Sequence, residues 1–320
     1  MDTQFNTGDI GILNKEVLFD TTPNAWQLYN VVMQGSGYTM TDGLGDITDN
    51  SLDADATNVA LVFKQAPGRF SEETGGGYVE TIWIIDDGHG MNVNLLAKSF
   101  VFATKVPHAG NSLGHFGAGG SAASFTIADD KTVLTKEPNG QLLVGTLSKS
   151  SFGEDGSFKD TGKLRPANHD ERQLFMEQLG IDEDSFGESH GTIIELKDIS
   201  KNLNSTAKKA AGALQSYCAE VFHKFIANGI TFKTIIIRDD AEDVVHEIVA
   251  ADPLMHDIEG ATTYKHKEQL QYEDPHGVLH NIDIRYSILS PTAPRGGLIE
   301  KQGIYVYRNN RQIVAHSTLN

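Results

Sequence analysis

The stretch DITDNSLDA, residues Asp46–Ala54, and the run IWIIDDGHGM, residues 82–91, decide the fold and the candidate site of this chain. The first places carboxylate and amide side chains at helical spacing, and the second is an apolar run that stops at Asp86. Two further motifs follow in order, GHFGAGG at 114–120 and HGTIIEL at 190–196. Each motif alone is weak, because acidic clusters and Asp-Gly turns are common in loops. Their order and spacing predict a nucleotide site.

Composition places the chain in an ordinary globular class. Its 320 residues are 39% hydrophobic and 22% charged, with a net charge of −17. This length suits two medium domains better than one core. No apolar run approaches the roughly 20 residues of a membrane-spanning helix, and the acidic, polar start differs from a secretory signal. We therefore expect a cytoplasmic protein without a membrane segment.

Composition and motif content also exclude several classes of function. The single cysteine, Cys218, cannot form an internal disulfide or a zinc cluster, and its apolar neighbours favour an inert buried thiol. No P-loop motif is present, and Ser, His and Asp are too scattered for a hydrolytic triad. The negative charge repels nucleic acid on average. Direct nucleic-acid binding therefore stays open and would need a local basic patch or another subunit.

Hydrophobic periodicity predicts an α+β fold for the first part of the chain. A glycine-rich turn at 75–77 separates two β-rich segments, which fits a hairpin. The expected elements are a helix at 41–57, strands at 58–65 and 78–85, a helix at 92–103, strands at 132–136 and 141–148, a helix at 169–180 and a strand at 192–196. A loop lid is expected at about 104–120 and an insertion at about 149–188.

The second part of the chain changes character near residue 200. A long amphipathic helix is expected over 205–229, ended by Gly229. The expected strands are 230–239, 243–250, 265–274, 281–289 and 303–314. We therefore predict two domains, 1–200 and 201–320, of which the second is an α+β module.

The acidic helix offers groups for chemistry on bound phosphates. Asp46 and Asn50 are four residues apart, so a helix would present both on one face. A carboxylate there could hold a water molecule and accept its proton, and the Asn50 amide oxygen could ligate Mg²⁺. Asp49 and Asp53 are placed to cap, to tie the backbone or to support the site from its edge. For this motif alone, a solvated acidic face is the alternative.

The strand end at Asp86 offers groups that suit a nucleobase. A carboxylate accepts a hydrogen bond from an exocyclic amino group such as that of adenine, whereas guanine presents a carbonyl there. Gly88 and Gly90, followed by Met91, leave room for a flat ring close to the backbone. Thr192 could support the carboxylate through its hydroxyl. A simple turn and a structural threonine are the alternatives.

The glycine-rich stretch before the run SAASF could bind an anion. Its backbone N–H groups would face the anion at a helix N-terminus, which predicts triphosphate binding without a lysine. A packing or turn role is the alternative. The expected nucleotide-contacting residues here are Gly114, His115, Phe116, Gly117, Ala118, Gly119 and Gly120. The histidines of the motifs lack metal-ligand spacing, and we expect them to be local structural residues.

Together, the four motifs resemble those of the GHKL ATPases, the superfamily of gyrase, heat-shock chaperone, histidine kinase and MutL ATPases. The resemblance covers about residues 25–200. DITDNSLDA resembles the family's N box, DDGHGM its adenine box, GHFGAGG its phosphate-lid box and HGTIIEL its last box. The amino-acid sequences of these motifs are most similar to those of MORC-like and chaperone-like members. The resemblance implies a Bergerat-type ATP-binding α/β sandwich, followed by a transducer-like domain of the ribosomal S5 type.

The resemblance also implies roles for individual residues. Asn50 would ligate Mg²⁺, Asp86 would receive adenine with the help of Thr192, and Gly90 would sit against the base. Gly117 and Gly119 would hold the phosphates.

Two departures from the family pattern affect turnover. The general-base position, usually Glu, is Asp46, one methylene shorter, which predicts slow or absent hydrolysis. Two positions that carry a lysine in relatives hold Ser121 and Val314. Phosphate neutralisation would then fall to Mg²⁺, backbone amides and a cation such as Lys98, Lys105, Arg295 or Lys301.

The implied function is a Mg²⁺-dependent conformational switch. ATP binding would order the lid, two subunits would close into a homodimer, and slow hydrolysis through Asp46 would reopen them. The alternative is a nucleotide-gated interaction module that binds ATP with little or no hydrolysis. An acidic interaction domain with coincidental motifs would have to explain four motifs in order. Antiviral defence, DNA compaction or repair, and client remodelling all fit, with a C-terminal effector region or partner protein.

Overall fold

The structure is a computed structural model that describes ten segments of the chain. The described residues are 39–71, 76–101, 119–151, 162–200, 205–239, 241–255, 261–265, 270–275, 277–288 and 302–317. Gly114, His115, Phe116, Gly117 and Ala118, and most of the expected lid, lie outside the described residues.

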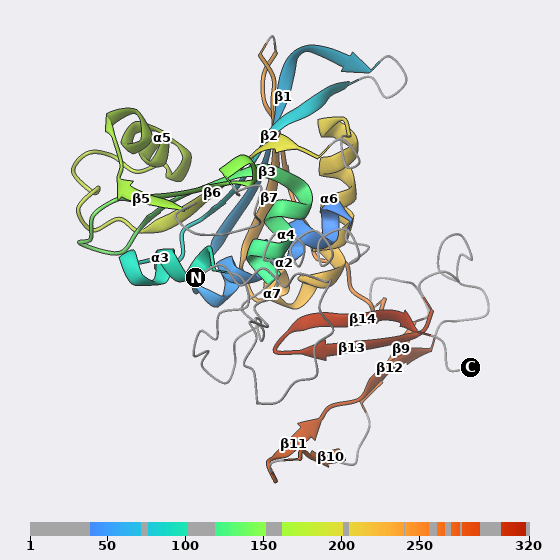
Figure 1. Cartoon of the computed structure of the whole chain (residues 1–320). Helices are drawn as coiled ribbons and strands as arrows, with labels where there is room; N and C mark the ends of the chain where they lie inside the picture. The colour runs from blue at the N-terminus through green and yellow to red at the C-terminus, as the bar shows by residue number, and fades with distance from the viewer. Residues whose placement is uncertain are drawn as a thin grey trace, which may run out of the picture.

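An eight-stranded sheet forms the centre of the molecule (Figure 1). Its strands follow the order β5-β4-β3-β6-β2-β1-β7-β8, and all neighbours are antiparallel except β1 and β7. The strands are β1 (Asn58–Ser71), β2 (Gly76–Asp86), β3 (Ala128–Lys136), β4 (Leu143–Ser148), β5 (Lys163–Pro166), β6 (Gly191–Ile199), β7 (Thr231–Ile237) and β8 (Val244–Glu247). The predicted hairpin is confirmed, since β1 pairs with β2 from Val59↔Asp86 onwards.

The two faces of the sheet are both apolar, because side chains alternate along each strand and helices cover both sides. Leu61 and Phe63 of β1 lie on one face with Ile82 and Ile84 of β2. Val62, between them in sequence, lies in a separate cluster on the other face. Each fully buried Leu or Ile side chain contributes about 1.5–3 kcal/mol to folding.

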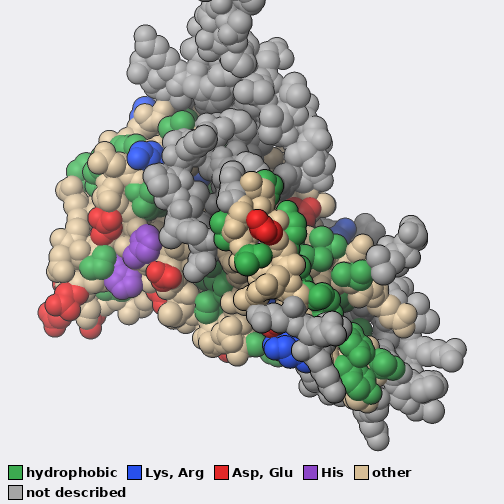
Figure 2. Space-filling model, turned by 90° about the horizontal axis from the view of Figure 1, so that it is seen from below, with side chains coloured by type: hydrophobic (Ala, Val, Ile, Leu, Met, Phe, Trp, Pro, Cys, Tyr) green, Lys and Arg blue, Asp and Glu red, His purple; other side chains and the backbone are tan. Residues whose placement is uncertain are grey.

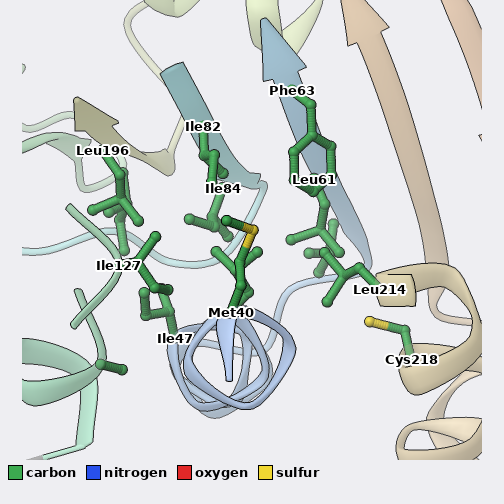
Figure 3. Close-up of a cluster of buried hydrophobic side chains, with 14 of the residues drawn as sticks. Met40, Ile47, Leu61, Phe63, Ile82, Ile84, Ile127, Leu196, Leu214 and Cys218 are labelled. Carbon is green, nitrogen blue, oxygen red and sulfur yellow. The ribbon is translucent and has the colours of Figure 1, made fainter. Parts of the chain in front are cut away.

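Three helices cover the first face, which we call the helix face (Figure 1). They are α2 (Met40–Asp53), α4 (Gly119–Ile127) and α6 (Ala207–Val221). Figure 3 shows Met40 and Ile47 of α2 directed at the strands, with Ile127 and Leu214 from the two other helices beside them. The core of this face therefore fixes α2, the helix with the acidic motif, against the sheet.

The opposite face is covered by α5 (His169–Leu179), whose Phe175 is fully buried against Val62 and Ile193. Thus part of the expected 149–188 insertion supports the sheet: β5 forms its edge and α5 covers its second face. The other helices of the described segments are α3 (Val93–Ser99), α7 (His223–Ala227) and a 3-10 turn, η1 (Lys149–Ser151). The helix expected over 92–103 thus ends at Ser99, with Phe100 as its C-cap.

The acidic motif forms the predicted helix. Thr39 caps α2 by accepting from the Asp42 N–H at 3.1 Å, and the Asp42 carboxylate accepts from the Thr39 N–H at 3.2 Å. This reciprocal capping box satisfies backbone groups that the first turn leaves unpaired. The helix can therefore begin despite the glycines in its first turns.

The prediction of a single helix over 205–229 is wrong, because the segment forms two helices, α6 and α7, that are divided at Phe222. Phe222 has φ −103° and ψ 14°, outside helical geometry. Its ring is fully buried and stacks on Phe232, with 5.4 Å between the centroids. The chain turns at this residue because the ring gains more from the core than the backbone gains from continuing the helix.

The strands beyond β8 form three separate two-stranded sheets. They are β9 (Thr262–Lys265) with β12 (Arg285–Ile288), β10 (Leu270–Glu273) with β11 (Leu279–Ile282), and β13 (Ile304–Arg308) with β14 (Arg311–Ser317). Two predicted strands are therefore corrected. The segment 281–289 contributes to two sheets, and 303–314 is a hairpin that turns at Asn309-Asn310, where both residues have positive φ.

The central sheet continues past residue 200, since β7 and β8 are its members. The division into 1–200 and 201–320 stays a proposal about domain organisation. None of the helices in the described segments is both long and apolar enough to cross a membrane.

Candidate functional site

Polar side chains from three neighbouring strands meet on the helix face of the sheet. Asp86 ends β2 and is paired with Thr192 of β6, which in turn is paired with Thr135 of β3. Paired residues of antiparallel strands point to the same face. We call these three residues the strand-end row. The sequence predicts two of its members, and Thr135 is an addition from the structure.

Asp86 lies at the centre of a hydrogen-bonded network and is only 3% exposed. Its Oδ2 accepts from the Ser51 hydroxyl at 2.8 Å, and its Oδ1 accepts from the Gly88 N–H at 3.0 Å. Burial raises the pKa of Asp86 to about 6, although both bonds favour the ionised form. The carboxylate is therefore held in one orientation and remains largely ionised at neutral pH.

The Thr192 hydroxyl bonds to Thr135 of β3, whereas Asp86 of β2 is its partner in strand register. The Thr192 and Thr135 hydroxyls are 3.0 Å apart, and the Thr135 hydroxyl also lies 3.2 Å from the Gly191 carbonyl oxygen. Thr192 thus stands beside Asp86 in register while its hydroxyl bonds to Thr135. The predicted support of Asp86 by Thr192 stays a prediction.

The turn after Asp86 is fixed by backbone contacts. Gly90 has φ +72°, and a Cβ placed on it would lie 2.0 Å from the Lys136 carbonyl oxygen, so no larger residue fits. Gly88 donates to Asp86 as described above, and Met91 donates its N–H to the Thr135 hydroxyl at 2.9 Å. The adenine-box motif therefore packs directly onto the strand-end row.

Other polar residues of this turn have structural partners. Asp87 accepts four bonds of 2.7–2.8 Å from the backbone and side chains of Thr57 and Asn58, and these bonds lower its pKa despite burial. Ring nitrogens of His89 and His190 lie 2.8 Å from the carbonyl oxygens of Gly90 and Gly88. Both histidines thus hold loop backbone.

Helix α2 brings the acidic motif to the same place. Ser51, which bonds to Asp86, lies in the last turn of α2, directly after Asn50. Asn50 is exposed, whereas Asp46 and Asp53 are partly buried. Asp46 and Asn50 lie one helical turn apart on one side of α2, about 6 Å along its axis. The Ser51–Asp86 bond joins the two principal motifs into one site.

An arginine from the C-terminal hairpin contacts this helix, and the sequence does not identify it as a site residue. Arg311 Nε lies 2.7 Å from Asp49 Oδ1, and one terminal nitrogen lies 3.2 Å from Asp46 Oδ1. Burial raises the pKa of Asp49 to about 7, against the effect of the Arg311 charge. The Asn-Asn turn before Arg311 is the signal in the sequence that could have placed it at a hairpin corner.

Two lysines near the site differ in environment. Lys98, a predicted phosphate contact, is exposed on α3. Lys131 of β3 points to the helix face, is 4% exposed, and its Nζ lies 5.2 Å from the Phe100 ring centroid. Burial lowers the pKa of Lys131 to about 8, and no ion pair to it is seen within the described segments. Periodicity alone would not have identified Lys131 as a buried residue, because it stands between Asp130 and Thr132 at the polar start of β3.

Gly119 and Gly120, the last two residues of the glycine-rich motif, form the first turn of α4. This helix lies beside α2 on the helix face, and Ile127 near its end packs with Ile47. The N-terminus of a helix presents unpaired N–H groups, as the predicted anion site requires. Contact with phosphates stays a prediction.

The donor groups on α2 suit a hard cation. Asn50 supplies an amide oxygen, and Asp46 and Asp53 supply carboxylate oxygens, which are the ligand types that Mg²⁺ prefers. Within the described segments, no group of three or more His, Cys, Asp or Glu side chains could hold a metal ion by itself. The arrangement fits a cation held by one or two protein oxygens together with phosphates.

Comparison with known families agrees with this geometry. Residues 38–178 match the family model described as "Histidine kinase-, DNA gyrase B-, and HSP90-like ATPase". A comparison with curated proteins found no match. The matched residues include α2, the Asp86 strand end and α4, and the mixed sheet with α2, α4 and α6 packed on its helix face is consistent with the α/β sandwich expected of this family. The chain therefore contains an ATP-binding domain of the GHKL superfamily.

Proposed function

We propose that the chain is a Mg²⁺-dependent GHKL-type ATPase whose nucleotide-driven closure promotes homodimerisation. The Ser51–Asp86 bond supports this proposal most, because it joins the acidic helix to the strand-end row within one site. A base bound at the row would leave its phosphates beside Asn50 and Asp46, one turn further along α2.

In this proposal, Asp86 accepts a hydrogen bond from the adenine amino group. Gly90 packs against the Lys136 backbone and Met91 bonds to Thr135, which would leave the base a flat surface close to the backbone. Thr192 completes the row beside Asp86. The selectivity for adenine over guanine follows from the acceptor character of an ionised carboxylate.

The phosphates would lie between α2 and the first turn of α4. Asn50 would hold Mg²⁺, with Asp53 at the edge of the site, and Gly119 and Gly120 would offer backbone N–H groups. When bound, Mg²⁺ would offset phosphate charge. Gly114, His115, Phe116, Gly117, Ala118 and Lys98 are proposed as further nucleotide contacts from the lid and α3.

Hydrolysis would use Asp46 as general base. Its carboxylate would accept a proton from a water molecule as the water oxygen bonds to the γ-phosphorus. The bond between that phosphorus and the bridging oxygen breaks, and ADP and inorganic phosphate leave. A positioned general base typically accelerates such a step by about 10²–10⁴-fold.

A nucleotide-gated module with little or no hydrolysis is the second candidate, and one observation favours it. Asp46 is one methylene shorter than the usual glutamate, which reduces its reach toward a water molecule at the γ-phosphate.

The wider assignment is part of the same proposal. It includes a MORC-like or chaperone-like subtype, a transducer-like region over 201–320, a cytoplasmic location, and a C-terminal effector region or partner protein. Antiviral defence, DNA compaction or repair, and client remodelling are the proposed settings. Direct nucleic-acid binding stays open; the described Lys and Arg side chains are scattered on the face shown in Figure 2.

The decisive experiment measures ATP turnover with and without Mg²⁺, together with ATP binding, for the wild type, Asp46→Ala, Asp46→Glu and Asp86→Asn. We expect Asp46→Ala to abolish turnover with binding retained, and Asp46→Glu to increase turnover by restoring the longer base. Asp86→Asn should weaken binding.

Each other result has a definite meaning. Tight binding by the wild type without turnover selects the nucleotide-gated module. Turnover that survives Asp46→Ala removes Asp46 as the base. No binding of ATP by the wild type would sink both candidates.

A further inference from the structure

The C-terminal hairpin reaches the candidate general base through one side chain. Arg311 begins β14 directly after the Asn309-Asn310 turn, where φ is +49° and +68°. Positive φ at both turn residues is typical of a tight type I′ hairpin. This turn carries the Arg311 side chain to α2, more than 260 positions away in the sequence.

Arg311 bridges two carboxylates of α2, and we call this three-residue arrangement the Arg311 clamp. Its Nε lies 2.7 Å from Asp49 Oδ1 and its terminal nitrogen 3.2 Å from Asp46 Oδ1. The exposed fractions of the side chains are 14% for Arg311, 13% for Asp49 and 26% for Asp46. Asp49 is therefore the deeper anchor, and Asp46 is the partner that still reaches solvent.

The rest of the guanidinium is also occupied. A second terminal nitrogen donates to the Gln312 carbonyl oxygen at 3.2 Å, and the group lies 5.9 Å from the Phe222 ring centroid. A planar guanidinium held on several sides has little freedom to rotate, and it can hold two carboxylates in a defined geometry. Removing charged groups from water costs free energy, which offsets the attraction between them. The clamp therefore does not by itself indicate a role in stability.

We propose that Arg311 is a positioning residue for Asp46, through which the C-terminal hairpin sets the activity of the site. This inference rests on the proposed function. By fixing Oδ1, Arg311 holds the short carboxylate in one orientation. The hairpin must then be docked on α2 for turnover, while nucleotide affinity depends on other residues.

The experiment compares Arg311→Met and Arg311→Lys with Arg308→Met in the full chain. Arg308 is the exposed residue directly opposite Arg311 in the same hairpin, which makes it a matched control. For each variant, the turnover number at saturating Mg-ATP is measured at one fixed pH, and ATP binding is measured by titration.

We expect Arg311→Met to lower the turnover number at least about tenfold, with the dissociation constant changed by less than about threefold. Lysine should restore part of the rate, since one ammonium cannot replace the guanidinium fork. Arg308→Met should match the wild type.

Arg308→Met leaves Asp46, Asp49 and Arg311 in place, so a change in turnover confined to the Arg311 variants can be assigned to the clamp.

Unchanged turnover in Arg311→Met would overturn the inference and leave the ATPase proposal standing. Faster turnover would also overturn it, because Arg311 would then restrain Asp46. Binding without turnover in the wild type removes the positioning role and selects the nucleotide-gated module, whereas absence of binding defeats the proposed function before any variant is compared.

If Arg311→Met does not fold, Asp49→Asn replaces it. Loss of that anchor should lower turnover several-fold at constant affinity, and an unchanged rate would reject the clamp.

Discussion

A single buried carboxylate, Asp86, connects sequence, burial and the proposed recognition of adenine. Its place at the end of an apolar strand buries it, and burial raises its pKa to about 6. Ser51 and Gly88 then fix both oxygens. The consequence is an acceptor that is ionised at neutral pH but close to its titration range.

We therefore predict that ATP affinity falls as the pH drops through about 6. The raised pKa means that free Asp86 takes up a proton there, and a protonated carboxyl group is a poorer acceptor for the adenine amino group. Well below the pKa, the ionised fraction falls about tenfold for each pH unit. Titrations of ATP binding between pH 5 and 8 measure this effect. Phosphate groups titrate in the same range, so Asp86→Asn supplies the baseline; equal pH dependence in the variant and the wild type would contradict the prediction.

For the buried Lys131 we predict that a substitution stabilises the protein. Burial lowers its pKa from 10.5 to about 8. Between these values the unfolded chain binds more protons than the folded one, so stability rises with pH. Lys131→Met should therefore raise the free energy of unfolding at pH 7 by about 1–3 kcal/mol. Urea unfolding should show that this gain shrinks between pH 8 and 10.5. The exposed Lys98→Met is the control, and a destabilised Lys131→Met would show that the lysine is satisfied in the folded state.

The sequence predicts residues whose role depends on their own motif and misses those whose role depends on tertiary contacts. Asp86 and Asn50 belong to local patterns. Thr135 and Arg311 become visible only when strand register and the hairpin bring them to the site. Lys131 follows Asp129 and Asp130 at the polar start of β3, and only the fold shows that its side chain is buried.

At the scale of elements, α2 is held between two other helices of the helix face. Gly43 lies close to Ile127 of α4, and Gly45 lies close to Tyr217 of α6. A Cβ placed on Gly45 would lie 2.5 Å from Tyr217 Cε1. The glycines that weaken α2 as an isolated helix therefore allow its neighbours to approach.

We predict that Gly45→Ala destabilises the protein by about 1–3 kcal/mol. Alanine favours a helix by up to about 1 kcal/mol, but the overlap with the Tyr217 ring outweighs this gain. Unfolding in urea measures the difference. The control is Gly212→Ala in α6, where a Cβ meets nothing within 4 Å and the helix should gain about 0.5–1 kcal/mol. Adding Tyr217→Leu to Gly45→Ala should recover part of the loss, and no recovery would refute overlap as the cause.

Element prediction succeeds where one pattern decides the structure and fails where two compete. The predicted pairing of β1 with β2 is confirmed, although Gly76 and Gly77 of the expected turn belong to β2 and pair with Ser71 and Phe70. The continuous helix over 205–229 fails because helix periodicity at Phe222 competes with aromatic burial against Phe232. The strand over 303–314 fails because the Asn309-Asn310 turn has a stronger backbone preference than its apolar flanks.

At the scale of the whole molecule, two kinds of sheet coexist. The central sheet has both faces covered by helices, and its inner strands are almost fully buried. The two-stranded sheets β9–β12 and β10–β11 expose large apolar side chains that include Tyr264, Leu279 and Tyr286. An isolated two-stranded sheet is marginally stable in water. The central sheet should therefore provide most of the protection against unfolding, although β7 and β8 join it from beyond residue 200.

We accordingly predict a large difference in amide hydrogen exchange within one chain. Amides of β1, β2 and β6 should exchange only through global unfolding, because their bonds are buried and paired on both sides. Amides of β9, β10, β11 and β12 should exchange through small local openings, at rates at least about 100-fold faster. Mass-spectrometric exchange on the intact protein compares all of these strands in one sample. Equal protection of β9–β12 and β1 at low protein concentration would contradict the prediction, because it would require these apolar strands to be covered within a single chain. Protection that appears only as the concentration rises would instead show that a second copy covers them, which would make the exposed apolar side chains part of a dimer interface.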